Sequence, residues 1–320
     1  MFMRAVTRPS ILVLLALPTF GCAATVAPSV SRPASLPAPS PTPAAGLTVQ
    51  HEDYARARAQ FHTRLLRHGP APQPFHAASP PATVSEVDYA EGRKAWLSPA
   101  PAGKSPAVLF LHGGFSFGPS DWEMTAQFRD AGFVVMTPML RGENGQPGDY
   151  TLFYDEVDDV LAAADYLAAL PFVDASRIFV AGHSIGGTLT LLAAQASNRF
   201  RAAAAFSGSP DQQAFLRGQE QLAPFDLGDM RELQLRSPLA YAESFKCPTR
   251  LYRGDQELYF ANLEKVASLA RRKGLDVAAV VVPGDHYSAV PEEIRRAVEL
   301  FTSVQRVASM NDGIGPVAKR

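Results

Sequence analysis

The stretch RIFVAGHSIGGTLTLLAAQA, residues 177–196, places a serine between a buried strand and a helix. Its first five residues form a short apolar run, which is typical of a strand covered on both faces. A helical pattern begins at Gly186. Ser184 therefore lies on a sharp strand-to-helix turn, where the helix N-terminus stabilises developing negative charge. We predict that Ser184 is a catalytic nucleophile.

The pattern Gly-x-Ser-x-Gly occurs twice, at residues 114–118 and 182–186, so the pattern alone does not select Ser184. Ser116, in the first copy, also follows a strand. However, Gly118-Pro119 comes before any helix can start there, and Ser120 or Asp121 is the natural helix cap. The local context therefore favours Ser184 over Ser116.

The first copy suggests a different use, because His112-Gly113-Gly114 ends a strand and enters a loop. Glycines let the backbone approach a ligand closely and direct its amides toward it. We expect the amide of Gly114 or Phe115, together with that of Ile185, to bind the oxyanion of a tetrahedral intermediate. The alternative is a glycine-rich turn without a catalytic part.

A serine hydroxyl needs a base with a pKa near neutrality, and histidine is the natural choice. Of the seven histidines only His286 follows Ser184, in the order serine, acid, histidine that this fold uses. Two carboxylates, Asp255 and Glu257, follow the preceding strand and are both candidates for the acid. His112 and His183 are expected to have structural roles.

Strand and helix patterns alternate from Val84 onward, which predicts an α/β fold with a mostly parallel sheet and helices on both faces. An antiparallel hairpin is expected at one edge. The predicted strands are 85–89, 93–97, 107–112, 133–137, 178–181, 202–206, 250–252 and 277–282, and the predicted helices are 50–68, 122–131, 153–169, 186–196, 260–272 and 291–307. The mixed segment 208–245 either shapes a pocket or is a surface excursion.

The N-terminus is predicted to be an export signal. Arg4 and Arg8 precede a short apolar run, and Gly21-Cys22 follows a proline break. The run is too short to span a bilayer, which needs roughly 20 residues. Cys22 is a candidate lipidation site, although Thr19 departs from the leucine usual in a lipobox. We expect an exported protein, either a membrane-anchored lipoprotein of the bacterial cell envelope or a soluble periplasmic or secreted protein.

These patterns divide the chain into five segments. They are a signal peptide (1–22), a Pro/Ala/Ser-rich disordered linker (23–49), a helix with its connection (50–82), an α/β domain that carries Ser184 and His286 (83–308) and a flexible tail (309–320). Hydrophobic residues make up 47% and charged residues 19%, with a formal net charge of −1. This balance is typical of a globular protein and gives no indication of a nucleic-acid partner.

The region from about Val84 to Val307 resembles the catalytic domain of the prolyl oligopeptidase family, including its dienelactone-hydrolase-like and acyl-peptidase relatives. The resemblance rests on LHGGF (111–115), Arg141-Gly142, VDASRIFVAGHSIGG (173–187), SPLAYAESFKCPT (237–249), Gly254 and His286. It implies an α/β-hydrolase fold and a serine hydrolase that needs no cofactor. It also implies Glu257 as the acid, three residues after Gly254, where the family usually has aspartate.

Peptidases of this family carry an N-terminal β-propeller, for which this chain has no room. We therefore expect an esterase-like enzyme acting on a small ester or short peptide. An aminopeptidase or acyl-peptidase is the alternative, and a non-catalytic binding protein or a structural lipoprotein are hypotheses of other classes. Substrate preference is expected to depend on 208–245 and on Phe115, Phe117 and Trp122.

Four carboxylates gather at Asp155, Glu156, Asp158 and Asp159, which raises the possibility of a metal site. Negative charge in the first turns of a helix is stabilising by itself. We therefore interpret the cluster as a solvated helix start, and we expect no metal and no cofactor. The sequence also lacks a His-Glu-x-x-His run and a phosphate-binding glycine loop.

Overall fold

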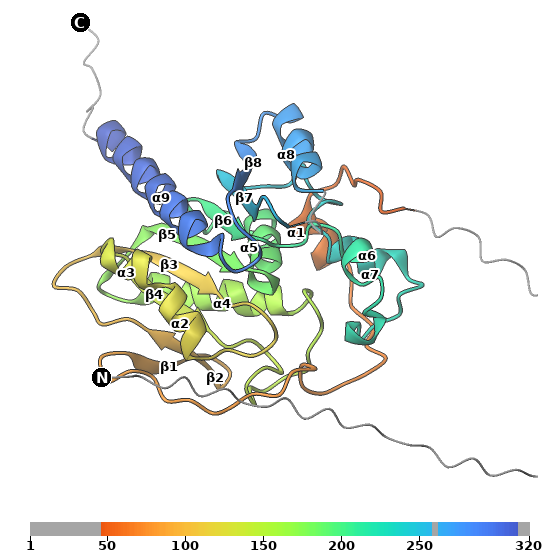
Figure 1. Cartoon of the computed structure of the whole chain (residues 1–320), viewed down its shortest axis with the longest axis horizontal. Coiled ribbons are helices and arrows are strands. Elements are labelled where there is room, and N and C mark those ends of the chain that lie inside the picture. Colours follow the sequence, from red (N-terminus) through yellow and green to blue (C-terminus); the bar gives the residue numbers. More distant parts are fainter. Residues whose placement is uncertain (1–45, 258–261, 313–320) are drawn as a thin grey trace, which may run out of the picture. The chain divides into compact units, whose positions relative to one another are not determined.

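The computed structural model describes residues 46–257 and 262–312, with side chains described as far as residue 304. An eight-stranded sheet forms the centre of this part, in the order β1-β2-β4-β3-β5-β6-β7-β8 (Figure 1). The strands are β1 (Ser85–Ala90), β2 (Arg93–Leu97), β3 (Ser105–Leu111), β4 (Val134–Pro138), β5 (Val173–His183), β6 (Ala203–Phe206), β7 (Thr249–Gly254) and β8 (Val277–Val282). All eight predicted strands are therefore confirmed.

Neighbouring strands from β4 to β8 are parallel, while β1 and β2 are antiparallel at one edge. This confirms the predicted hairpin and the α/β fold. Strand β5 begins at Val173, five residues before the start of the strand predicted at 178–181. Its first residues pair with the start of β3, where Ser105 lies opposite Val173.

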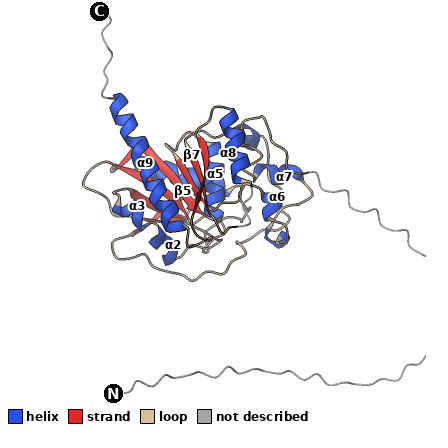
Figure 2. Cartoon of the chain, turned by 45° about the horizontal axis from the view of Figure 1, so that its top comes forward, coloured by secondary structure: helices blue, strands red, loops and turns tan. Residues whose placement is uncertain are grey.

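Helices cover both faces of the sheet, and the strands between them appear as one layer in Figure 2. Side chains alternate along a strand, so Leu109 and Leu111 of β3 pack on one face, whereas Val108 and Phe110 pack on the other. The first face carries α1 (Tyr54–Ala59), α4 (Glu156–Ala169), α5 (Ile185–Ala196) and α8 (Leu263–Arg272), and the second carries α2 (Pro119–Met124), α3 (Ala126–Asp130) and α9 (Val290–Asp312).

The carboxyl ends of the parallel strands meet at one edge of the sheet. His183 at the end of β5 lies opposite Phe206 of β6, and Gly254 at the end of β7 lies opposite Val282 of β8. The loops after β3, β5, β6, β7 and β8 therefore emerge side by side. In open α/β sheets this edge is where ligands bind.

The predicted helix over 50–68 is wrong for most of its length, because α1 covers only Tyr54–Ala59. Beyond it the backbone is bound to other parts of the fold. Tyr154 Oη donates to the carbonyl of Phe61, and Glu232 accepts from Thr63 Oγ1 and from the amide of Arg64. These tertiary contacts override the local helical spacing.

The predicted helix over 122–131 is divided into α2 and α3 at Thr125. The hydroxyl of Thr125 donates to the carbonyl of Trp122 at 2.7 Å, and its amide donates to the same carbonyl at 3.0 Å. A threonine that binds the backbone in this way competes with the helical hydrogen bond and bends the chain. Gly118, rather than Ser120 or Asp121, precedes the first helical residue, and Asp121 binds its amide.

The segment 208–245 folds into three short helices near the same edge of the sheet. They are α6 (Gln212–Phe215), the 3₁₀-helix η1 (Glu220–Leu222) and α7 (Met230–Leu235). Within the described residues, none of the helices combines the length and the hydropathy needed to cross a bilayer.

Candidate active site

Ser184 lies on a strained turn between β5 and α5, with φ 55° and ψ −113°. Few non-glycine residues adopt such angles, and the surrounding contacts hold this one in place. The Ser184 amide donates to the carbonyl of Phe206 at 2.8 Å, and the Gly186 amide donates to the carbonyl of His112 at 3.1 Å. The turn is thus fixed to the ends of both neighbouring strands.

The glycines around Ser184 are required by close backbone packing. A Cβ atom at Gly186 would lie 2.1 Å from the carbonyl oxygen of Leu111. One at Gly182 would lie 2.5 Å from the carbonyl oxygen of Gly186. The pattern Gly-x-Ser-x-Gly therefore reflects how closely α5 approaches β3 at this point.

The ring of His286 lies beside the carboxylate of Glu257, with 2.7 Å between Nδ1 and Oε1. The other carboxylate oxygen of Glu257 accepts from Ser207 Oγ at 2.9 Å and from the Gly254 amide at 3.2 Å. Burial alone would raise the pKa of Glu257, but the hydrogen bonds from His286 and Ser207 lower it below its usual value. Glu257 is therefore an ionised, buried carboxylate at neutral pH.

Asp255, the second candidate acid, is exposed and binds a backbone amide. Its Oδ1 accepts the amide of Gly284 at 2.9 Å, which ties the loop after β7 to the loop after β8. Of the two carboxylates that the sequence left open, the structure brings Glu257 to the imidazole. The role of Asp255 is to hold the loop that carries His286.

Ser184 and His286 line the same pocket, which also includes Glu257. Among the hydrogen bonds of the described residues, none joins Ser184 Oγ to the imidazole. Catalytic hydrogen bonds are often long before a substrate binds and shorten in the complex. The structure therefore brings together the three predicted residues from the ends of β5, β7 and β8.

His183 binds the backbone of the loop that carries His286. Its Nε2 donates to the carbonyl of His286 at 2.8 Å, and the two ring centroids are 4.7 Å apart. Burial lowers the pKa of His183 to about 4, so the ring is neutral at pH 7. These contacts fit the expectation that His183 has a structural role.

His112 forms a buried pair with Glu143, with 3.0 Å between Nε2 and Oε2. Burial alone would lower the pKa of His112, but the charge and hydrogen bond of Glu143 raise it to about 9. The same carboxylate accepts the amide of Leu140. The pair joins the loop after β3 to the loop after β4.

Two cavities meet at Ser184. The first has a volume of about 720 Å³ and includes residues of the segment 208–245, among them Ala214, Phe215, Arg217 and Gln219. The second has a volume of about 560 Å³ and is lined by Gln73, Gly114, Phe117, Met124, His183 and Tyr287, among others. The segment 208–245 thus shapes a pocket.

Two aromatic residues that we expected to influence substrate preference are placed differently. Phe117 lines the second cavity. Trp122 is buried in the core against Trp96, with ring centroids 6.1 Å apart. Trp122 therefore supports the fold and does not line either cavity.

Of the amides predicted to bind an oxyanion, the one of Phe115 is already bound. It donates to Gln73 Oε1 at 2.8 Å, and Gln73 Nε2 donates to Ser116 Oγ at 2.9 Å. Ile185 opens α5 directly after Ser184. Among the described hydrogen bonds, no protein acceptor binds the amides of Gly114 and Ile185.

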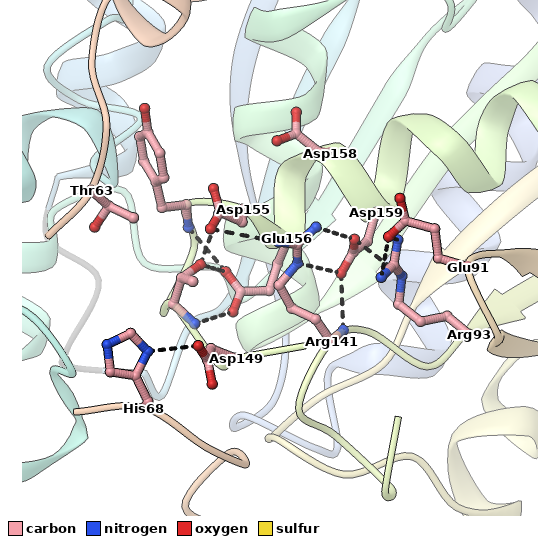
Figure 3. Close-up of polar contacts among 12 residues, drawn as sticks. Thr63, His68, Glu91, Arg93, Arg141, Asp149, Asp155, Glu156, Asp158 and Asp159 are labelled. Atoms are coloured by element: carbon pink, nitrogen blue, oxygen red, sulfur yellow. Dashed lines mark hydrogen bonds and ion pairs between the residues drawn. The ribbon is translucent and has the colours of Figure 1, made fainter. Parts of the chain in front are cut away.

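The four carboxylates at the start of α4 were interpreted as a solvated helix start, and this was wrong for two of them, Glu156 and Asp159, which are buried (Figure 3). Glu156 is 3% exposed and accepts from the amide and hydroxyl of Thr151. Asp159 is 0% exposed and binds the guanidinium of Arg141. The hydrogen-bond donors, Thr151 and Arg141, come from the chain before α4, so the sequence of the helix alone does not indicate that these carboxylates are buried.

Two residues of the site were missed by the sequence analysis. Ser207 follows β6 and binds Glu257, and Gln73 comes from the connection before β1 and binds the loop after β3. A polar residue directly after an apolar strand was a possible signal for Ser207. No comparable signal points to Gln73. The predicted lipidation site Cys22 lies outside the described residues.

Comparison with protein families gives a match between residues 120–303 and the prolyl oligopeptidase family. Among curated proteins, acylamino-acid-releasing enzyme 2 of Oryza sativa subsp. japonica is 27% identical over 248 residues. The match covers 66% of this chain and 32% of the rice protein. The chain thus spans about a third of the length of that relative.

Solved structures give the same fold. A puromycin-hydrolyzing peptidase of Mycobacterium tuberculosis has a TM-score of 0.61 and 23% identity, covering 71% of this chain and 41% of that one. An esterase of Pyrobaculum calidifontis has a TM-score of 0.54 and 20% identity, covering 72% and 86% of the two chains. Both likenesses place the chain among the α/β-hydrolase folds.

Proposed function

The chain belongs to the prolyl oligopeptidase family of serine hydrolases, and we propose that it cleaves carboxylic ester or amide bonds through an acyl-enzyme. Ser184 is the nucleophile, His286 the general base and Glu257 the acid. The observation that carries this proposal is the 2.7 Å contact between His286 Nδ1 and the buried carboxylate of Glu257, in the pocket that Ser184 lines. A carboxylate in this position fixes the tautomer in which Nε2 accepts a proton.

The proposed reaction has two halves. Ser184 Oγ attacks the substrate carbonyl carbon while His286 Nε2 takes its proton, and the carbonyl oxygen becomes an oxyanion bound by backbone amides. The intermediate collapses when His286 returns the proton to the leaving group. Water, activated by the same imidazole, then releases the acid and restores the Ser184 hydroxyl.

Two cavities that are both lined by Ser184 favour a substrate with groups of moderate size on both sides of the scissile bond. Phe215 offers an apolar surface in the larger cavity. We favour an esterase-like activity on small esters over cleavage of oligopeptides. The relatives include an acylamino-acid-releasing enzyme and an esterase, so release of an acylated residue from a short peptide is the second candidate.

The test is a panel of p-nitrophenyl esters and N-acylated or free aminoacyl p-nitroanilides with the purified protein. A higher kcat/KM for the esters than for the aminoacyl p-nitroanilides supports the esterase-like proposal. A higher kcat/KM for the N-acylated aminoacyl p-nitroanilides than for all of the esters supports the acyl-peptidase candidate. Stoichiometric binding of such compounds without turnover or covalent labelling points instead to a non-catalytic binding protein.

We also propose that the protein is exported and anchored to a membrane through a lipid on Cys22. The support is the sequence of residues 1–22, with its positive start, short apolar run and Gly-Cys pair. In a bacterial host, metabolic labelling with a fatty acid is expected for the wild type and not for Cys22→Ser. Labelling of neither protein, with processing near Ala23, points to a soluble exported form.

A further inference from the structure

One side chain from the connection between α1 and β1, Gln73, holds the loop that follows β3. Its carboxamide uses both ends, because Oε1 accepts the Phe115 amide at 2.8 Å and Nε2 donates to Ser116 Oγ at 2.9 Å. It also packs on Gly114, where a Cβ atom would lie 2.9 Å from Oε1. Gly114 has a φ of +66°, which glycine adopts without strain.

Gln73 is delivered by a strap, residues 68–76, that is bound to the loop after β4. The Gly69 amide donates to Asp149 Oδ1 at 2.8 Å, and the Tyr150 amide donates to the carbonyl of Gly69 at 3.0 Å. The Ala71 amide donates to the carbonyl of Gly142 at 2.9 Å. Figure 3 shows His68 of the strap beside Asp149. The strap therefore has a defined path over the site.

A second carboxamide, that of Asn144, holds the same loop. The Phe117 amide donates to Asn144 Oδ1 at 2.7 Å, and Asn144 Nδ2 donates to the carbonyl of Phe117 at 2.8 Å. The Gly118 amide donates to Asp121 at 2.9 Å. Three amides of this loop are thus bound by side chains, whereas those of Gly114 and Ser116 have no protein acceptor among the described hydrogen bonds.

The loop that carries Gly114 passes close to Ser184. The adjacent Gly113 is so close that a Cβ atom there would lie 3.6 Å from Ser184 Cβ. The amide of Ile185 opens α5 directly after the serine. Two amides that converge on one oxygen are the usual form of an oxyanion hole.

We propose that Gln73 is a positioning residue of the oxyanion hole. It holds the Phe115 amide away from the reaction and fixes the Gly114 amide beside that of Ile185. This inference rests on the proposed hydrolase activity. It makes the strap part of the machinery that stabilises the transition state, although Gln73 itself touches no reacting atom.

The test compares the wild type with Gln73→Ala and Gln73→Met in steady-state hydrolysis of a p-nitrophenyl ester. An oxyanion-hole donor contributes about 10²–10³ in rate, so a misplaced donor is expected to lower kcat by about 10–100-fold. KM should change less than about threefold, since the contact acts on the transition state. Met keeps the length of Gln without its hydrogen bonds, and is expected to be as slow as Ala.

Two kinetic outcomes and one exchange outcome contradict the inference. A higher kcat for Gln73→Ala would mean that Gln73 blocks the oxyanion hole. A wild-type kcat for Gln73→Met would mean that Gln73 acts only by packing and not through its hydrogen bonds. Gln60→Ala, at the exposed end of α1, is the matched control and should retain the wild-type rate. Hydrogen exchange of the Phe115 amide should be faster in both Gln73 variants than in the wild type. Unchanged slow exchange would show that Gln73 does not hold this amide, and this measurement does not require that the protein hydrolyses an ester.

Discussion

The carboxylate of Glu257 lies 2.7 Å from Nδ1 of His286, whereas Asp255, two residues earlier, binds the backbone of Gly284 instead. A glutamate therefore occupies the place that an aspartate usually has in this family. Its second oxygen is held by Ser207 and Gly254, so the longer side chain has one fixed position. The proposed assignment of Glu257 as the acid rests on this geometry and can be tested directly.

Glu257→Gln is expected to lower kcat by roughly 10³–10⁴-fold, since an amide no longer selects the tautomer of His286 or stabilises its protonated form. Asp255→Asn is the matched control, because its oxygen can still accept the Gly284 amide, and its kcat should stay within about threefold of the wild type. Steady-state kinetics on a p-nitrophenyl ester measures both. A large loss in Asp255→Asn with an active Glu257→Gln reverses the assignment.

Gly186→Ala is expected to prevent folding, because the new methyl group would lie 2.1 Å from the carbonyl oxygen of Leu111. Neither backbone can move without breaking the contact between α5 and β3, so a loss of more than about 4 kcal/mol is expected. Soluble yield and thermal unfolding are the measurements. Gly103→Ala, which meets no atom within 4 Å, should behave like the wild type. A Gly186→Ala protein with wild-type Tm contradicts the packing described here.

Glu293 of α9 is expected to make the protein less stable as the pH rises. Its side chain is 0% exposed, and neither carboxyl oxygen has a hydrogen-bond partner among the described residues. Burial, with the charge of Glu257, raises its pKa from 4.5 to about 8. Between these values the folded state binds more protons than the unfolded state, so the free energy of unfolding falls with increasing pH.

Glu293→Gln removes this dependence. Urea unfolding from pH 5 to pH 9 should show a difference between variant and wild type that grows in favour of the variant up to about pH 8, by a few kcal/mol. The exposed Glu123→Gln should follow the wild-type curve. A difference between Glu293→Gln and the wild type that is the same at every pH contradicts the prediction.

The strands and most helices could be predicted because apolar runs buried on both faces differ clearly from their surroundings. Ser184 and His286 could be placed because a strand, a turn and a chain order constrained them. Contacts between distant segments were not predictable. Gln73 binds a loop 42 residues away in sequence, and Glu232 binds Thr63 and thereby ends α1 early.

The choice between Asp255 and Glu257 also depended on contacts between segments that are distant in sequence. Both residues leave the same strand, and the loop path decides which one turns toward the imidazole. That path depends on the close packing of Gly254 against Gly284, where a Cβ atom would lie 2.1 Å from a carbonyl oxygen. The resemblance to the family indicated Glu257, and the residues alone did not.

The measurement that tests the central claim most directly is hydrolysis of a p-nitrophenyl ester by the wild type and by Ser184→Ala. The wild type should turn over the ester and react at Ser184 with a fluorophosphonate, as located by mass spectrometry of the labelled peptide. Ser184→Ala should keep the wild-type Tm and lose at least about 10⁴-fold in kcat, with no labelling. Turnover by Ser184→Ala within about tenfold of the wild type contradicts the account.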